Sequence, residues 1–190
     1  MLPKRYPGAV WVESPHFYRG RVLDPGIITC HTTEGGEGPR SALWSAQWCA
    51  RKETGATAHF FVDNKNVYQS VECDLQAWHC SGGNPYSVGI EFAGKAAQKP
   101  EDWADAFSLD MLNVAADLMQ WIAREGNIPL IQLNVEALQL FKARKTVLPR
   151  GVCGHRDWVD AGFGGDHRDP GVNFPYNPLL MACNMREAFK

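Results

Sequence analysis

The chain has 190 residues, of which 45% are hydrophobic and 11% aromatic, so it can bury one sizeable core. The formal net charge is −2 and no dense run of Lys or Arg occurs, which argues against nucleic acid as a partner. No window reaches the roughly eighteen apolar residues of a membrane span, and the amino terminus lacks the apolar stretch of a signal peptide. We therefore expect one soluble domain over residues 1–190, made without a secretion signal and not inserted into membranes.

The first third of the chain predicts an irregular start followed by a strand and a helix. Residues 1–25 contain four prolines and predict an irregular arm with one short extended piece at "AVWVE". The apolar, β-branched run "GIITCH" (26–31) predicts a buried strand. Ser41 can cap a helix that reaches about Glu53, with Gly55 as the stop signal.

The remainder mixes strands and helices. In chain order it predicts a β-hairpin (56–63 and 67–71), a strand (87–94), an amphipathic helix (108–126), a helix after Asn134, a short strand (151–155) and a short last helix from Pro178. This order predicts an α/β fold, with a central mixed β-sheet flanked by helices.

Two histidines stand at the carboxyl ends of apolar runs, where side chains converge on a cleft in open sheets. These are His31 and His155, each of which, taken alone, is more often a hydrogen-bonded structural residue. A catalytic zinc needs about three ligands of the His and carboxylate type. The loop "GDHRDPG" (165–171) returns beside His155, and Asp169 is the favoured third ligand because Pro170 stiffens its backbone.

Glu91 is a carboxylate inside the apolar run "VGIEFAG", where burial without a partner is costly. Two explanations stay open. Glu91 lies on an edge strand or in a structural ion pair, or it is a general base with a raised pKa beside a metal-bound water.

Two further histidines are expected to have no part in catalysis. In "TAHFF", period-two alternation turns His59 to the face opposite Ala58 and Phe60. His16 lies in the proline-rich arm and is expected on the surface.

A set of motifs resembles a known family. The segments "IITCHTTEG", "TAHFFVDNKNVYQSV", "AWHC", "NPYSVGIEFAG" and "GVCGHRDW…GGDHRDPGVNFPY" resemble, in order and spacing, the zinc-dependent N-acetylmuramoyl-L-alanine amidases of type 2. That superfamily also holds peptidoglycan recognition proteins and phage lysozyme-amidases. The resemblance covers about residues 26–177 and is greatest to endolysin domains of phages that infect actinobacteria.

The resemblance implies hydrolysis of the amide between N-acetylmuramic acid and the L-alanine of the stem peptide. The partner would be bacterial peptidoglycan and the cofactor one Zn²⁺ per chain. The protein would be a monomer, made in the host cytoplasm and acting on the cell wall as the catalytic domain of an endolysin.

By position, His31, His155 and Asp169 match the family's zinc ligands, and Glu91 matches the acid that activates water. His167 stands where many relatives carry Lys, so we expect it to stabilise the transition-state oxyanion. An imidazole near its reference pKa is partly neutral at pH 7, which predicts a pH-sensitive contribution. Many relatives also carry Tyr at the position of Ala58, so a hydroxyl contribution is absent here.

Several residues are candidates for binding substrate. His79 and Asn84 precede the Glu91 strand and could line the groove, although a turn held by their hydrogen bonds explains them equally well. Trp44, Trp48 and Trp78 could stack on sugar rings, but the area such rings bury favours the core. The arginines of the last loop, Arg156 and Arg168, could bind stem-peptide carboxylates.

Two other classes of protein compete with an amidase. Peptidoglycan recognition proteins keep the fold and lose hydrolysis when a metal ligand is missing, but all three ligand positions are filled here.

The second competing class, a Cys–His peptidase, would draw on Cys30, Cys80 or Cys153. The six cysteines contain no CxxC pair, and we expect mostly reduced, buried thiols. Cys30 adjoins His31 along a strand and therefore points to the opposite face.

Overall fold

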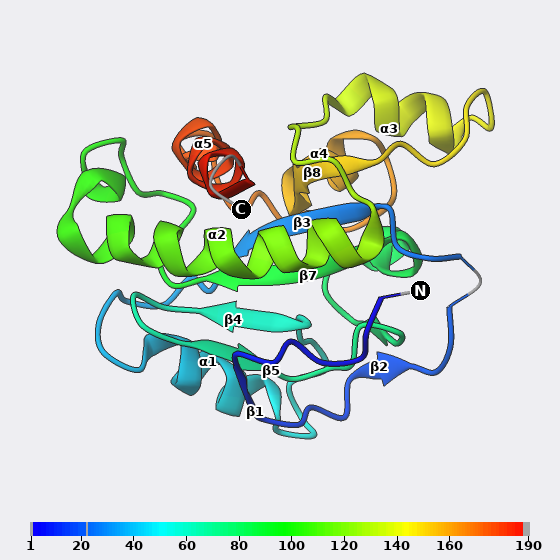
Figure 1. Ribbon diagram of the computed structural model, residues 1–190. Helices are drawn as coiled ribbons and strands as arrows, with labels where there is room; N and C mark the ends of the chain where they lie inside the picture. Colours follow the sequence, from blue (N-terminus) through cyan, green and yellow to red (C-terminus); the bar gives the residue numbers. More distant parts are fainter. Residues whose placement is uncertain (1, 22, 188–190) are drawn as a thin grey trace.

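The computed structural model describes residues 2–21 and 23–187. Residues 1, 22 and 188–190, which belong to the predicted domain and in part to the predicted arm, lie outside these ranges. A six-stranded sheet has the order β1-β5-β4-β7-β3-β8 (Figure 1). Its strands are β1 (Ala9–Trp11), β3 (Ile27–Thr32), β4 (Phe60–Val62), β5 (Val67–Gln69), β7 (Ser87–Phe92) and β8 (Gly151–Gly154). Strands β4 and β5 pair antiparallel and the other neighbours pair parallel, which confirms the predicted mixed sheet.

Within the described ranges, five α-helices surround the sheet. They are α1 (Ser41–Cys49), α2 (Ala106–Gly126), α3 (Val135–Lys142), α4 (His155–Asp160) and α5 (Tyr176–Glu187), with short 3₁₀ helices at η1 (Ser81–Tyr86) and η2 (Asp102–Ala104). Helix α1 ends at Cys49, four residues before the predicted end, and Arg40 rather than Ser41 is its N-cap. Helix α4 was not predicted, because its six residues are too few to show a hydrophobic period. None of the described helices combines the length and the apolar character needed to cross a membrane.

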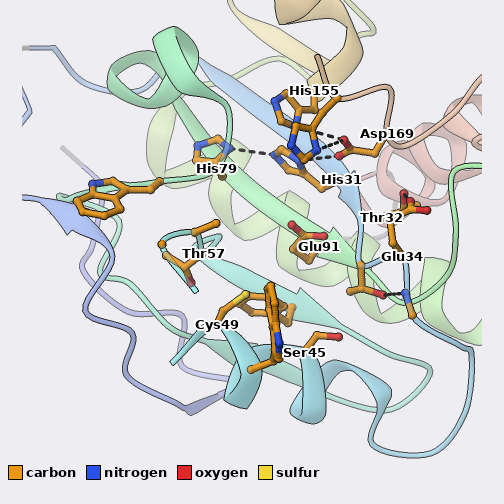
Figure 2. Close-up of a pocket in the computed structure, with 18 of the residues that line it drawn as sticks. His31, Thr32, Glu34, Ser45, Cys49, Thr57, His79, Glu91, His155 and Asp169 are labelled. Carbon is orange, nitrogen blue, oxygen red and sulfur yellow. Dashed lines mark hydrogen bonds and ion pairs between the residues drawn. The ribbon is translucent and has the colours of Figure 1, made fainter. Parts of the chain in front are cut away.

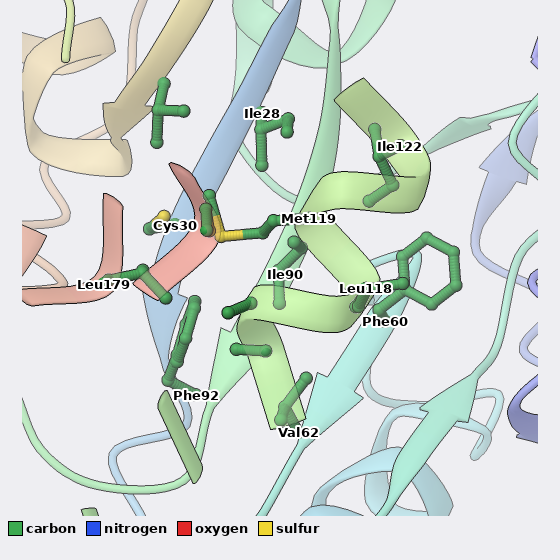
Figure 3. Close-up of a cluster of buried hydrophobic side chains, with 14 of the residues drawn as sticks. Ile28, Cys30, Phe60, Val62, Ile90, Phe92, Leu118, Met119, Ile122 and Leu179 are labelled. Atoms are coloured by element: carbon green, nitrogen blue, oxygen red, sulfur yellow. The ribbon is translucent and has the colours of Figure 1, made fainter. Parts of the chain in front are cut away.

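Alternation along the central strands separates a hydrophobic core from a functional face. One face of β3, β4 and β7 packs against α2 and α5 through the side chains drawn in Figure 3, which include Ile28, Cys30, Phe60, Val62, Ile90, Phe92, Leu118, Met119, Ile122 and Leu179. Because successive residues of a strand point to opposite faces, the other face of β3 and β7 carries His31 and Glu91. Helix α1 covers part of this second face through Ala42, Ala46 and Cys49.

The amino-terminal arm is more ordered than its prolines predict. Strand β1 pairs parallel with β5 at the edge of the sheet, and β2 (Phe17–Tyr18) pairs with β6 (Gln76–Ala77). The surface prediction for His16 is wrong. The residue is 5% exposed and its Nε2 lies 2.8 Å from the carbonyl oxygen of Arg51, because the arm packs on the segment that follows α1.

His59 is fully buried behind the functional face. Its Nδ1 accepts a hydrogen bond from the Gly89 N–H at 3.0 Å, and its Nε2 lies 3.1 Å from the Leu75 carbonyl oxygen and 2.9 Å from the Arg21 guanidinium. The predicted alternation is wrong at its start: strand β4 begins only at Phe60, so Ala58 packs with Phe61 rather than with Phe60. Burial, and then the Arg21 guanidinium, hold the pKa of His59 well below its usual range.

The pKa of His59 predicts acid destabilisation. The unfolded chain takes up a proton at this position as pH falls below about 6.5, whereas the folded chain does not, so stability is present above that pH and is lost below it. We expect His59→Gln, which keeps one acceptor and one donor, to reduce the slope of the unfolding free energy against pH by up to about 1.4 kcal/mol per pH unit. Urea unfolding between pH 7.5 and 5 measures this slope, and parallel curves for the two proteins would contradict the assignment.

Candidate active site

Three predicted ligands converge at the carboxyl ends of β3 and β8. His31 lies in β3, His155 begins α4 directly after β8, and Asp169 lies on the following loop. The Asp169 carboxylate bridges the two imidazoles: its Oδ2 lies 2.8 Å from His31 Nδ1, and its Oδ1 lies 3.2 Å from His155 Nδ1 (Figure 2). One ligand atom from each residue lies within 4.8 Å of the others, and all three residues are buried.

Backbone contacts hold the Asp169 loop against the sheet. The Arg156 N–H donates to the Asp169 carbonyl at 2.9 Å. A side chain at position 154 would obstruct this packing, because a Cβ on Gly154 would lie 2.6 Å from Tyr176 Oη and 2.7 Å from Pro170 Cδ. Gly154 therefore allows the loop to approach the end of β8 closely enough to place Asp169.

The donor set fits a zinc ion. Burial alone would raise the pKa of Asp169, but hydrogen bonds from His155 and His31 hold it well below its usual range, so the carboxylate is ionised. Burial lowers the pKa of His31, although Asp169 partly offsets the effect. Neutral imidazoles and an ionised carboxylate are the forms that bind zinc, and three such ligands leave a fourth position open.

Glu91 points into the same pocket from the neighbouring strand. It is the cross-strand partner of His31, and Figure 2 shows its side chain between the three candidate ligands and α1. The edge-strand explanation is wrong, because β7 is paired on both sides. Within the described part of the chain its buried Oε2 has no hydrogen-bond partner. Burial, followed by the negative charges of Asp169 and Glu34, raises the pKa of Glu91 well above its usual value.

His167 lies at the edge of the pocket. Its side chain is 68% exposed, and its ring stacks on that of His155 with centroids 4.9 Å apart and planes 11° apart. Its Nδ1 lies 3.7 Å from Asp169 Oδ1. The other ionisable groups of the loop do not line the pocket: Asp166 is exposed, and Arg168 forms an ion pair with Asp160.

His79 and Asn84 both line the pocket but are largely buried. The Asn84 Oδ1 accepts the backbone N–H groups of His79 at 3.0 Å and Cys80 at 2.7 Å, which holds the turn. His79 Nδ1 lies 3.0 Å from His31 Nε2, so His79 contacts a candidate ligand directly. A Cβ on Gly89 would lie 2.6 Å from His79 Nδ1, so this position needs glycine. Nothing in the motif "AWHC" indicated this contact.

The pocket has a volume of about 740 Å³, and five aromatic residues line it beside the ionisable groups: Tyr18, Phe61 and the three tryptophans Trp44, Trp48 and Trp78. The core prediction is wrong for two of them, since Trp44 is 62% and Trp48 is 53% exposed. The reason is that α1 packs its small residues inward, which turns the tryptophans outward. Among the lining residues there is neither Lys nor Arg, so the suggested role of Arg156 and Arg168 finds no support.

Comparison with known proteins identifies the family. Residues 21–172, which include every residue of the candidate centre, match the model of the N-acetylmuramoyl-L-alanine amidase family. The chain belongs to this amidase family.

Two curated members of the amidase family are similar to it in sequence. N-acetylmuramoyl-L-alanine amidase CwlH of Bacillus subtilis is 30% identical over 58% of this chain and 43% of its own length. N-acetylmuramoyl-L-alanine amidase XlyA of the same species is 28% identical over 77% of this chain and 46% of its own length. The chain therefore spans less than half the length of these two relatives.

A solved structure supports the fold. Staphylococcus aureus hydrolase AmiA, determined in complex with its ligand, superposes with a TM-score of 0.66 over 99% of this chain and 98% of its own, at 15% identity. At that identity the likeness shows the amidase fold alone.

Proposed function

We propose that this amidase-family chain hydrolyses the amide between N-acetylmuramic acid and L-alanine in bacterial peptidoglycan, with one Zn²⁺ held by His31, His155 and Asp169. One observation carries the proposal: a buried His–His–Asp group shares a pocket with Glu91, a carboxylate whose Oε2 has no partner in the described chain. The family match supports the choice of bond. We further propose that the chain acts on the wall as a monomeric, single-domain endolysin catalytic unit, without a nucleic-acid partner.

The reaction adds water across the amide, giving the lactyl carboxylate and the free amine of L-alanine. Zinc held by His31, His155 and Asp169 would supply Lewis-acid chemistry here: it would polarise the carbonyl oxygen and make water acidic enough to lose a proton near neutral pH. Glu91 accepts that proton as the water oxygen attacks the carbonyl carbon, and returns it to the leaving nitrogen as the C–N bond breaks. A raised pKa suits Glu91 to both transfers.

His167 is suited to stabilise the charge that develops on the carbonyl oxygen. It lies beside His155 and Asp169 at the mouth of the pocket and carries a ring N–H. One well-placed donor contributes about 3–4 kcal/mol to such a transition state.

His79 orients His31 in this proposal. When His31 holds zinc through Nδ1, the atom that faces Asp169, its ring proton would lie on Nε2 and would be donated to His79 Nδ1, which is 3.0 Å away. His79 then carries its proton on Nε2, which lies 3.4 Å from Ser87 Oγ, and that hydroxyl donates to the Gly83 carbonyl at 2.9 Å. A hydrogen bond of this kind fixes both the tautomer and the ring orientation of a ligand.

We expect His79→Phe, which removes the acceptor and keeps a ring of similar size, to lower zinc affinity about 10- to 100-fold. His79→Asn places an acceptor oxygen at the δ position and should retain most of the affinity. Competition against a fluorescent zinc chelator measures both. Equal affinities in the wild type and His79→Phe would remove His79 from the account.

The arrangement of the pocket gives less support to the two competing classes, a Cys–His peptidase and a recognition protein that does not hydrolyse. Every cysteine is a buried thiol, as predicted. Cys80 Sγ lies 3.8 Å from His79 Nε2, the geometry of a weak Cys–His contact. However, Cys80 is fully buried, does not line the pocket, and burial raises its pKa to about 12, so a thiolate nucleophile is not available. A recognition protein without hydrolysis is disfavoured because the three ligand residues and Glu91 are all present.

Release of amino groups from purified peptidoglycan tests the proposal. We expect release to stop with a zinc chelator and to resume when zinc is restored. It should persist after alkylation of accessible thiols and in Cys80→Ser, which removes the buried thiol that reagents reach poorly. Activity that survives chelation and disappears in Cys80→Ser would favour the Cys–His class instead.

A further inference from the structure

Arg21 follows β2 on the amino-terminal arm, is partly buried and does not line the pocket. A guanidinium has five N–H groups in one rigid plane. Arg21 uses them on four backbone carbonyl groups: Nε donates to Cys73 at 3.1 Å, Nη1 to Asn84 and to Pro85 at 3.1 Å each, and Nη2 to Ser87 at 2.9 Å. One side chain of the arm therefore holds two distant segments of the chain in a fixed geometry.

The position of this guanidinium is costly for a residue that only anchors the arm. Burial lowers the pKa of Arg21 to about 10, so the group is still charged near neutral pH. Burying a charge costs free energy, which its hydrogen bonds must offset. The arm is already held by pairing of β1 with β5 and of β2 with β6. The contacts of Arg21 therefore point to a more specific role than anchoring.

Two of the four carbonyl groups belong to residues whose side chains meet His79. The Asn84 Oδ1 accepts the backbone N–H groups of His79 at 3.0 Å and Cys80 at 2.7 Å. The Ser87 Oγ lies 3.4 Å from His79 Nε2. By holding the backbone of Asn84 and Ser87, Arg21 fixes the groups that contact the main chain and the ring of His79.

His59 provides a third connection between Arg21 and His79. The Arg21 Nη2 lies 2.9 Å from His59 Nε2, and His59 Nδ1 accepts the Gly89 N–H at 3.0 Å. Gly89 packs on the His79 ring, because a Cβ at this position would lie 2.6 Å from His79 Nδ1. The rings of His59 and His79 also contact each other, with centroids 5.5 Å apart. Three sets of contacts therefore link one guanidinium to one imidazole.

His79 connects this network to the candidate metal centre. Its Nδ1 lies 3.0 Å from His31 Nε2 (Figure 2). Outer hydrogen-bond partners set the orientation of a metal-ligating imidazole. Here the outer partner is itself held in place by the planar guanidinium of Arg21, which a flexible ammonium group would not reproduce.

We propose that Arg21 is a positioning residue for the metal centre: it fixes the turn that carries His79 and, through His79, the orientation of His31. The inference rests on the proposed function, because the orientation of His31 matters for holding zinc. Arg21 acts only through other residues and is not one of the groups that line the pocket.

Zinc affinity of Arg21→Met tests the proposal, because this variant keeps most of the aliphatic stem and removes every donor. We expect the affinity to fall about 3- to 10-fold, less than for His79→Phe, because Arg21 is one contact further from the ligand. Competition against a fluorescent zinc chelator measures the change.

Arg150→Met is the matched control. Arg150 also donates to backbone carbonyl groups, through Nε to Asn127 at 3.0 Å and through Nη2 to Gly126, and it does not line the pocket. Both variants should lower the free energy of unfolding measured in urea. Only Arg21→Met should lower the zinc affinity.

The double variant Arg21→Met/His79→Phe separates positioning from general support of the fold. If Arg21 acts through His79, the Arg21 substitution should change zinc affinity by less than about two-fold in the His79→Phe background. The visible absorption of the Co²⁺-loaded protein reports the geometry of the ligands. We expect the spectrum of Arg21→Met to shift towards that of His79→Phe, and the spectrum of Arg150→Met to match the wild type.

Arg21→Lys keeps the charge without the planar group, so its zinc affinity should lie between those of the wild type and Arg21→Met. It takes the place of Arg21→Met in the double variant if Arg21→Met does not fold. Wild-type zinc affinity in the Arg21 variants, or a loss of the same size with and without His79, would overturn the proposal. If the predicted zinc affinities are found but the wild type cleaves no peptidoglycan, the proposed function fails and the role of Arg21 at the metal centre stands.

Discussion

Glu91→Gln is expected to keep its zinc and its fold and to lose about 10²- to 10⁴-fold in turnover on peptidoglycan. The amide has nearly the shape of the carboxylate but cannot take up the proton of the attacking water. The substitution also removes a carboxyl group whose charged form is disfavoured by burial, so stability should not fall. Steady-state turnover and zinc content, measured on the same preparation, test both halves of the expectation.

Glu34→Gln is the control for Glu91→Gln, because Glu34 is a second acidic residue of the same pocket. Its Oε1 accepts hydrogen bonds from Thr32 Oγ1 at 2.7 Å and from the Ala96 N–H at 2.8 Å, and a Gln oxygen can accept both. We expect turnover within a few-fold of the wild type. Wild-type turnover in Glu91→Gln would remove Glu91 from the mechanism.

Asp169→Ala is expected to lose zinc and, with it, all measurable hydrolysis. The carboxylate contacts both imidazoles, so its removal takes away one ligand and the partner that holds the other two. The loss of affinity should exceed the roughly 10- to 100-fold expected when an outer hydrogen-bond partner is removed. Metal content after dialysis and activity with added zinc measure the effect.

Asp169→Cys is the matched rescue, because a thiolate is also a zinc ligand. We expect it to bind zinc far better than Asp169→Ala and to recover part of the turnover. Stoichiometric zinc in Asp169→Ala after dialysis would show that the metal is held elsewhere.

The parts of the fold that follow from local pattern were predicted correctly. The β-branched run at 26–31 and the helix that ends at Gly126 form where the sequence indicates, and the predicted hairpin forms from shorter strands, Phe60–Val62 and Val67–Gln69. The same patterns place His31 and His155 at neighbouring strand ends, since parallel strands bring their carboxyl ends to one edge of the sheet. Glu91 was recognisable because a carboxylate interrupts an apolar strand.

Features that depend on contacts between distant segments were not predicted. The arm pairs with strands that lie more than fifty residues further along the chain, and its prolines give no sign of this. The contact between His31 and His79 joins residues 48 positions apart. The tryptophans of α1 were misplaced because ring size favours burial, whereas the helix packs its alanines inward.

Mass spectrometry of the products from purified peptidoglycan tests the central claim most directly, because it identifies both the bond and the substrate. The proposed function predicts glycan strands that keep intact lactyl groups as free carboxylic acids, and stem peptides that begin with the free amine of L-alanine. Neither product should form in the presence of a zinc chelator. Peptide fragments cut within the stem, or cleaved glycan strands, would contradict the assignment of this site to the amide of N-acetylmuramic acid.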